Sequence, residues 1–146
     1  MTSCLFCRIA AREVEAFIVY EDDVALAFLD TRPLFPGHTL LVPKLHVETL
    51  PELPADAVGP LFARAQALCR GVENAMRAEG TFVAINNRIS QSVPHLHVHI
   101  VPRRTKDGLK GFFWPRTKYR DAEEAEAVRV AITDALNVQK HPFRSQ

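Results

Sequence analysis

The amino-acid sequence predicts an α+β protein, in which an antiparallel sheet of about five strands carries one long packed helix and a second helix follows near the C-terminus. Segments with strand character outnumber helical ones and are joined by short connections, which suits antiparallel neighbours better than a βαβ array. Only residues 55–78 show helical periodicity over a long stretch before the C-terminal region. No repeat, low-complexity tract or long linker divides the 146 residues, so we expect one domain spanning 1–146.

The composition is that of a globular protein and excludes several classes. Hydrophobic residues make up 47% and charged residues 24%, and 18 Lys and Arg against 17 Asp and Glu give a net charge of +1. No run approaches the roughly 18 apolar residues of a membrane span, and residues 1–8 lack a basic start followed by an apolar core. We therefore expect a cytoplasmic protein with no membrane association, and the near-neutral charge argues against a dedicated nucleic-acid binder.

Three strands are expected in the N-terminal part. Residues 16–20 are rich in aromatic and β-branched side chains, residues 21–23 supply turn chemistry, and residues 24–29 are apolar again, which predicts a hairpin. Two prolines and a glycine mark residues 31–37 as a loop. Residues 38–43 then predict a third strand, which a proline ends.

A long amphipathic helix is expected over residues 55–78, with Gly80 as its C-terminal stop. Its apolar residues recur at intervals of three and four, which places them on one helix face. They are Val58, Leu61, Phe62, Ala65, Leu68, Cys69, Val72 and Met76.

The C-terminal half predicts two more strands and a last helix. Residues 81–85 and 94–101 have strand character, with a polar connection between them. The last helix is expected over 122–138, with Asp121 as its N-cap and glutamates near its positive end.

Three of the six histidines alternate with apolar residues in one of these strands. Because side chains in a strand alternate between faces, His95, His97 and His99 share one face, and the intervening apolar residues, Leu96, Val98 and Ile100, share the other. A polar strand face that is histidine by chance is the less favoured interpretation.

Three adjacent imidazoles suit either a metal centre or nucleophilic chemistry at phosphorus or an acyl carbon. Gln91 and Ser92 lie just upstream, and their amide and hydroxyl groups could hold anionic oxygens. Their position favours a phosphate ligand.

The cysteines raise a separate metal question. Cys4 and Cys7 form a C-x-x-C pair and Cys69 stands alone, and an odd count in an apparently cytosolic chain is no disulfide scaffold. The pair is half of a zinc site, a redox dithiol or a coincidence, and we favour the metal.

The stretch 95–101, His-Leu-His-Val-His-Ile-Val, resembles the histidine-triad (HIT) family pattern of alternating histidine and hydrophobic residues. Residues 91–93, 26–30, 37–39 and 42–46 also resemble that family, in its branch of small nucleotide hydrolases with purine nucleoside phosphoramidate activity. The resemblance covers roughly residues 4 to 104.

The resemblance implies a role for each matching residue. His97 would attack the α-phosphorus and carry a transient nucleotidyl group, His99 would bind phosphate and assist the leaving group, and His38 would orient the triad. Phosphate oxygens would be held by Ser92 and Gln91, with Asn86 or Asn87 in the same pocket. Asp30 would bind both ribose hydroxyls, and the base slot would be formed by Phe6, Ile9, Val14, Phe28 and Thr31. For the apolar members of this slot, core packing is the alternative.

The same resemblance implies a structural zinc, because many bacterial members begin with a cysteine pair. Here the ligands would be Cys4, Cys7, His46 and His95. Two thiolates and two imidazoles make a closed site with no position for a catalytic water, so hydrolysis would depend on His97. The alternative is a free, reduced thiol pair.

The loop 86–91 departs from the family pattern. It has Ser90 where glycine is usual, and two or three residues are missing. Glycine there allows the backbone to approach phosphate closely, so its loss puts the loop's phosphate contacts and the leaving-group preference in doubt. Arg88 could supply a cation to a longer phosphate chain, although a solvated arginine is the favoured interpretation.

Residues 101–120 combine seven basic residues with aromatic ones, a pattern that could bind single-stranded nucleic acid. Acidic residues follow at once, so much of this charge is expected to pair locally. Exposed aromatics suit a protein interface better. Family members are usually homodimers, so we place Trp114 at such an interface.

We therefore expect a hydrolase that releases a nucleoside monophosphate from purine nucleoside phosphoramidates through a nucleotidyl-histidine intermediate. Cleavage of dinucleoside polyphosphates is the main competing hypothesis. Two more hypotheses are a nucleotide-binding regulatory module with incidental turnover and a metalloenzyme that uses the triad as ligands.

Overall fold

The computed structural model of the protein describes residues 3–110 and 116–138. The chain forms two compact units, of which the first ends at Asp107 and the second begins at Gly108. The expectation of a single domain over the whole chain stays a prediction.

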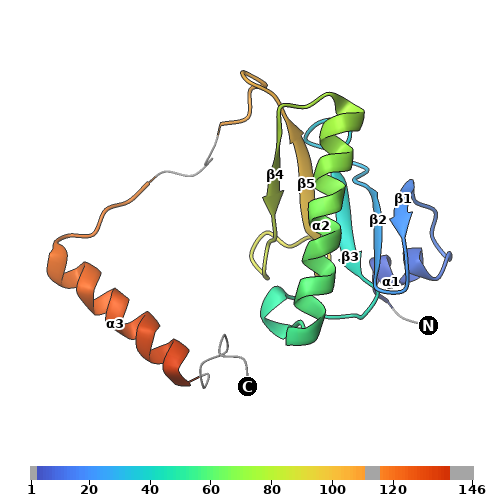
Figure 1. The fold of residues 1–146 in the computed structure, drawn as a ribbon. Helices are drawn as coiled ribbons and strands as arrows, with labels where there is room; N and C mark the ends of the chain where they lie inside the picture. Colours follow the sequence, from blue (N-terminus) through green and yellow to red (C-terminus); the bar gives the residue numbers. More distant parts are fainter. Residues whose placement is uncertain (1–2, 111–115, 139–146) are drawn as a thin grey trace. The chain divides into compact units, whose positions relative to one another are not determined.

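The first unit contains one antiparallel sheet, as the sequence predicts (Figure 1). Its strands follow the order β1-β2-β3-β5-β4, and every neighbouring pair is antiparallel. The strands are β1 (Ile18–Glu21), β2 (Ala25–Leu29), β3 (Thr39–Pro43), β4 (Gly80–Ala84) and β5 (Val98–Arg103). The predicted α+β class, with about five strands and a long helix on the sheet, is therefore confirmed.

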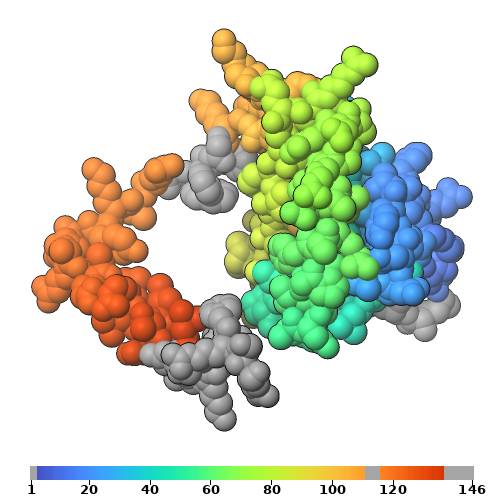
Figure 2. Space-filling model, viewed as in Figure 1, coloured from blue at the N-terminus to red at the C-terminus, as the bar shows by residue number. Residues whose placement is uncertain are grey.

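One face of the sheet packs against the long helix α2 (Ala55–Met76) (Figure 1). Alternate strand residues form this core with the buried helix residues Leu61, Ala65 and Val72. Leu41, on the central strand, is completely buried in it. In Figure 2 the side chains of α2, in green, cover the middle of this face.

The opposite face carries a short helix, α1 (Leu5–Ala10), that the sequence analysis did not predict. Phe6 and Ile9 of α1 pack against the alternate residues of β2 and β3, among them Phe28 and Leu40. Six residues are too few to show a helical period, which explains why the pattern was missed.

The ends of two elements differ from expectation. The helix ends at Met76, where Arg77 adopts the left-handed conformation with φ 51°, and Gly80 begins β4 instead of ending α2. Regular strand pairing of β5 begins at Val98, not at residue 94, because the preceding segment bonds elsewhere: the Leu96 N–H donates to the Val47 carbonyl at 2.7 Å.

The helix face is narrower than predicted, and one short element was missed. Val58 and Phe62 are 36% and 37% exposed, so they lie at the margin of the packed stripe.

A 3₁₀ turn, η1 (Leu50–Glu52), precedes α2 and is closed by a capping box between Thr49 and Glu52.

The second unit contains α3 (Ala122–Val138), with the bounds that the sequence predicts. The Asp121 carboxylate accepts the N–H of Glu124 at 2.8 Å, which confirms Asp121 as the N-cap. Across the described residues, no helix is both long enough and apolar enough to cross a bilayer.

The central strand should carry a large share of the stability. Replacing Leu41 by alanine should lower the free energy of unfolding by about 2–5 kcal/mol, because a fully buried leucine leaves a cavity. The matched change Ile89→Ala, at a side chain 82% exposed, should cost less than about 1 kcal/mol. Urea unfolding of both variants tests this, and equal midpoints would contradict the central role of β3.

Candidate active site and metal cluster

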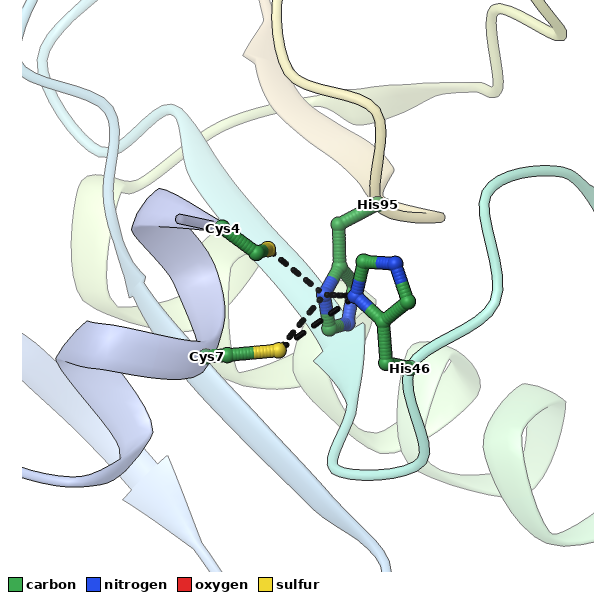
Figure 3. A group of neighbouring side chains, drawn as sticks. All are labelled: Cys4, Cys7, His46 and His95. Carbon is green, nitrogen blue, oxygen red and sulfur yellow. Dashed lines mark hydrogen bonds between the residues drawn. The ribbon is translucent and has the colours of Figure 1, made fainter. Parts of the chain in front are cut away.

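Two cysteines of the α1 segment face two histidines from distant parts of the chain (Figure 3). The Sγ atom of Cys4 lies 3.3 Å from Nδ1 of His95, and the Sγ atom of Cys7 lies 3.3 Å from Nδ1 of His46. Cys7 Sγ is also 3.5 Å from His95 Nδ1, and the two Nδ1 atoms are 3.1 Å apart. The four residues expected to bind metal are therefore together, and their donor atoms converge on one point.

This donor set fits a zinc ion. Bond lengths of 2.0–2.3 Å to nitrogen and sulfur give a tetrahedron with edges of about 3.3–3.8 Å, close to the measured separations. Nε2 of His95 lies 2.8 Å from the Pro43 carbonyl, which only accepts, so the ring proton is on Nε2 and Nδ1 keeps its lone pair. Burial lowers the pKa of His95, which also favours this neutral ring.

A pocket of about 540 Å³ opens on the same face of the sheet. Nine of the predicted functional residues line it, together with residues that the sequence analysis did not assign, such as Leu5, Glu15 and Arg32. The nine are Phe6, Ile9, Val14, Phe28, Asp30, Thr31, Ser92, His97 and His99. The charged residues Glu15 and Arg32 carry no motif, so no pattern in the sequence could have placed them there.

His97 is held in one tautomer by the backbone. Its Nδ1 lies 2.7 Å from the carbonyl oxygen of His95, so Nδ1 carries the proton and donates. In the neutral ring, Nε2 then has the free lone pair. His97 is only 3% exposed and lines the pocket, so this lone pair belongs to a shielded imidazole at the pocket wall.

His38 orients His99 through a second chain of hydrogen bonds. The Leu34 N–H donates to Nδ1 of His38 at 3.1 Å, so Nε2 of His38 carries the proton and donates to Nδ1 of His99 at 3.0 Å. Nε2 of His99 therefore carries a hydrogen. Burial, with the nearby charges of His97 and His38, lowers the pKa of His99 to about 4.

Asp30 lies beside this pair. Its Oδ1 accepts the Arg32 N–H at 2.8 Å, and its Oδ2 is 3.7 Å from Nε2 of His38. Asp30, His38 and His99 are close enough to hold a metal. A metal on Nε2 of His38 would move the ring proton to Nδ1, and the Leu34 N–H would then lose its acceptor. The hydrogen-bonded arrangement therefore fits these three residues better.

The remaining predicted phosphate ligands are engaged elsewhere. Gln91 donates to the Glu48 carbonyl at 2.6 Å and accepts the Arg88 N–H at 2.8 Å. Asn87 accepts the Leu50 N–H at 2.9 Å, and Asn86 donates to the Ser90 carbonyl at 3.4 Å. None of the three is among the residues that line the pocket, and their roles stay predictions.

Part of the basic segment pairs locally, as expected from its acidic neighbours. Arg103 contacts Asp107 at 2.6 Å, and Arg120 contacts Glu124 at 3.2 Å. Trp114, assigned to an interface, lies outside the described residues.

Buried histidines should make the fold sensitive to acid. Burial lowers the pKa values of His38, His95 and His99 below the ordinary value near 6.5. As pH falls below 6.5, the unfolded chain takes up protons that the folded chain refuses, for His99 until about pH 4, so stability is lost in that interval. Each such group contributes up to about 1.4 kcal/mol per pH unit.

Urea unfolding of wild type and of His99→Asn at pH 7 and pH 5, at one zinc concentration, measures this effect. The variant should lose less stability than the wild type between the two pH values. An equal loss in both proteins would contradict the assignment to His99.

Comparison with known proteins gives three instructive relatives. An uncharacterized HIT-like protein of Mycobacterium tuberculosis is 39% identical over 124 residues, which covers 82% of this chain and 86% of that protein. An adenylylsulfatase of Arabidopsis thaliana is 36% identical over 108 residues, 73% of this chain and 55% of that protein. An adenosine 5′-monophosphoramidase of Candida albicans is 32% identical over 119 residues, 77% of this chain and 78% of that protein.

Solved structures share the fold. A protein from Streptococcus mutans superposes with a TM-score of 0.84 at 35% identity, covering 93% of this chain and 87% of that one. A zinc-bound histidine triad family protein from Mycobacterium smegmatis superposes with a TM-score of 0.70 at 34% identity, covering 93% of this chain and 97% of that one. Residues 11–106 of this chain also match the HIT domain. With the alternating histidines, the sheet and these relatives in agreement, the chain belongs to the HIT domain family.

Proposed function

We propose that this protein is a nucleotide hydrolase that releases a nucleoside monophosphate from purine nucleoside phosphoramidates through a covalent nucleotidyl-histidine intermediate. The observation that carries the proposal is the tautomer of His97. The His95 carbonyl holds the proton on Nδ1, and this leaves the Nε2 lone pair free as a nucleophile in the pocket.

The reaction follows in two steps. Nε2 of His97 attacks the phosphorus, the P–N bond breaks with its electron pair going to nitrogen, and the departing amine takes up a proton. Water then attacks the phosphorus of the nucleotidyl-histidine, breaks the bond to Nε2 and loses a proton, which restores the imidazole. His99 donates from Nε2 to the phosphate and assists the leaving group, and His38 acts by orienting His99.

The pocket lining supports a nucleotide as the ligand. The apolar side chains of Phe6, Ile9, Val14 and Phe28 line the pocket with Thr31, and together they would form the slot for a purine base. Asp30 would accept hydrogen bonds from the ribose hydroxyls. Ser92, which lines the pocket with His97 and His99, would hold a phosphate oxygen, with Gln91, Asn86 and Asn87 stabilising the loop next to it.

The named relatives support an adenylyl substrate. One is an adenosine 5′-monophosphoramidase and another an adenylylsulfatase, so both names describe a group attached to adenosine 5′-phosphate. A sulfate leaving group and the dinucleoside polyphosphates are the competing substrate classes, and a comparison of turnover rates separates them.

We further propose that Cys4, Cys7, His46 and His95 hold one structural zinc. The geometry of the four donor atoms and the zinc-bound relative support it. A closed four-coordinate ion contributes folding energy and leaves no site for a catalytic water. Because the cysteines must stay reduced to bind it, this site suits a reducing compartment such as the cytoplasm.

A homodimer is also proposed. Strand β4 lies at one edge of the sheet, and its Val83 is 43% exposed. Helix α2 packs next to this strand and carries the partly exposed Phe62. A strand at the edge of a sheet, with apolar neighbours, suits contact with a second copy. Light scattering that shows only a monomer would contradict this proposal.

The nucleophile is tested by comparing three substrates. Wild type should release AMP from adenosine 5′-phosphoramidate with a higher kcat/KM than from diadenosine tetraphosphate or adenylyl sulfate. His97→Ala should lower all three rates at least about a thousandfold, because the covalent route is lost. The exposed change Arg70→Ala on α2 should leave them unchanged.

The outcomes separate the competing hypotheses. If the wild type prefers the tetraphosphate or adenylyl sulfate, the proposed leaving group is wrong, whereas His97 stays the proposed nucleophile. Turnover that survives in His97→Ala would exclude the covalent mechanism, and no turnover in the wild type would favour a nucleotide-binding module.

Zinc content provides an independent test. Protein purified without chelator should contain one zinc per chain by elemental analysis, and Cys7→Ser should lose most of it because a thiolate ligand is removed. Cys69→Ser, at a cysteine on α2 far from the cluster in sequence, should retain it. Equal zinc in wild type and Cys7→Ser would contradict the ligand set.

A further inference from the structure

Phe6 lies between the two cysteines of the metal cluster and also touches the triad. Its ring lies edge-to-face against His97, with centroids 5.2 Å apart and planes at 85°. The same ring contacts His95 at 5.9 Å and Phe28 at 5.2 Å. Phe6 is only 4% exposed and lines the candidate nucleotide pocket, so one side chain borders the metal ligands, His97 and the pocket.

The helix that carries Phe6 has little to hold it in place besides side chains. Helix α1 has six residues, and its N-cap Cys4 makes no side-chain capping bond. A helix this short is not stable by itself in water. The two cysteines, which face His46 and His95 (Figure 3), help to anchor it to the sheet, as do the buried side chains of Phe6 and Ile9.

Two paths therefore connect the metal cluster with His97. The first is the backbone, because the carbonyl of the metal ligand His95 accepts the Nδ1 proton of His97. The second is Phe6, which follows Cys4 by two residues and precedes Cys7 by one. The backbone path does not depend on α1, whereas the second path exists only while α1 is docked.

We propose that Phe6 is a positioning residue: metal held by Cys4 and Cys7 docks α1, and the Phe6 ring then keeps the His97 imidazole aligned toward the pocket. The proposal rests on the proposed role of His97 as the nucleophile. It makes occupancy of the metal cluster a determinant of nucleotide binding and of the chemical step, in addition to stability.

The test compares Phe6→Leu with Ile9→Leu. Both variants keep an apolar side chain on α1 at the pocket wall, but only Phe6→Leu removes a ring from His97. Phe6→Leu should lower kcat for adenosine 5′-phosphoramidate on the order of tenfold, since a small misalignment of the attacking atom is costly. Ile9→Leu should change mainly KM. Thermal unfolding should show that both variants fold. If Phe6→Leu does not fold, Phe6→Met takes its place in the comparison.

A spectroscopic measurement separates this proposal from the proposed function. Nitrogen chemical shifts of the His97 ring report its tautomer and environment whether or not the protein turns over substrate. Removing zinc from the wild type with a chelator should shift these signals and weaken AMP binding at least about tenfold, because α1 leaves its place in the pocket wall. In Phe6→Leu the same removal should shift them much less, because the path is already broken.

The result that would overturn the proposal is a change in the His97 signals on zinc removal that is equally large in wild type and Phe6→Leu. Retention of full AMP affinity and unchanged His97 signals in the zinc-free wild type would overturn it as well. Loss of turnover in every protein, with the His97 signals still coupled to zinc through Phe6, would contradict the proposed function and leave the positioning role intact.

Discussion

The alternation of histidine with large apolar residues along residues 95–100 is the constraint on which the site depends. Leu96, Val98 and Ile100 are completely buried against α2, so the segment cannot rotate or shift by one residue without exposing them. Their burial forces the three imidazoles onto the opposite face. Packing in the hydrophobic core therefore determines the face on which the three imidazoles lie.

Backbone carbonyl and N–H groups then give each imidazole a different task. The Pro43 carbonyl leaves Nδ1 of His95 free for a metal, whereas the His95 carbonyl leaves Nε2 of His97 free for the pocket. The Leu34 N–H fixes the tautomer of His38, whose Nε2 then donates to Nδ1 of His99. The hydrogen of the His99 ring is therefore on Nε2. Three chemically identical side chains thus present different atoms, namely a lone pair toward the cysteines, a lone pair at the pocket and an N–H on Nε2, because their hydrogen-bond partners differ.

Most of the architecture could be predicted from sequence, because it depends on the spacing at which apolar residues recur along the chain. The strands, the long helix and the N-cap Asp121 follow from alternation, three-four spacing and capping chemistry. Helix α1 is too short for any period, and β5 begins late because the Leu96 N–H donates to the Val47 carbonyl instead of to β3, a contact that the pattern of residues 94–97 does not carry.

The site divides in the same way. The four candidate metal ligands and nine pocket residues carry side-chain chemistry that a motif can specify, and the structure brings each set together. The tautomers depend on backbone atoms of Pro43, Leu34 and His95, whose positions no residue type encodes. For the same reason the amides of the 86–91 loop, which resemble phosphate ligands in sequence, are found in hydrogen bonds within the loop and to the segment 48–50.

The loop of residues 86–91 is held in a strained backbone conformation by side-chain contacts. Arg88 and Ser90 both have positive φ, at 68° and 59°, a conformation that costs a non-glycine residue free energy and persists only where its surroundings impose it. Here the imposing contacts are the Gln91 and Asn87 amides and the ion pair of Arg88 with Glu52, next to the capping box of Thr49. Those contacts join the loop to residues 48–52, and Glu48 lines a hollow together with Cys4, His46 and Ser92. Because the loop and the candidate metal ligands share these neighbours, changes at the loop should also be felt at the cysteine pair and the two histidines beside it.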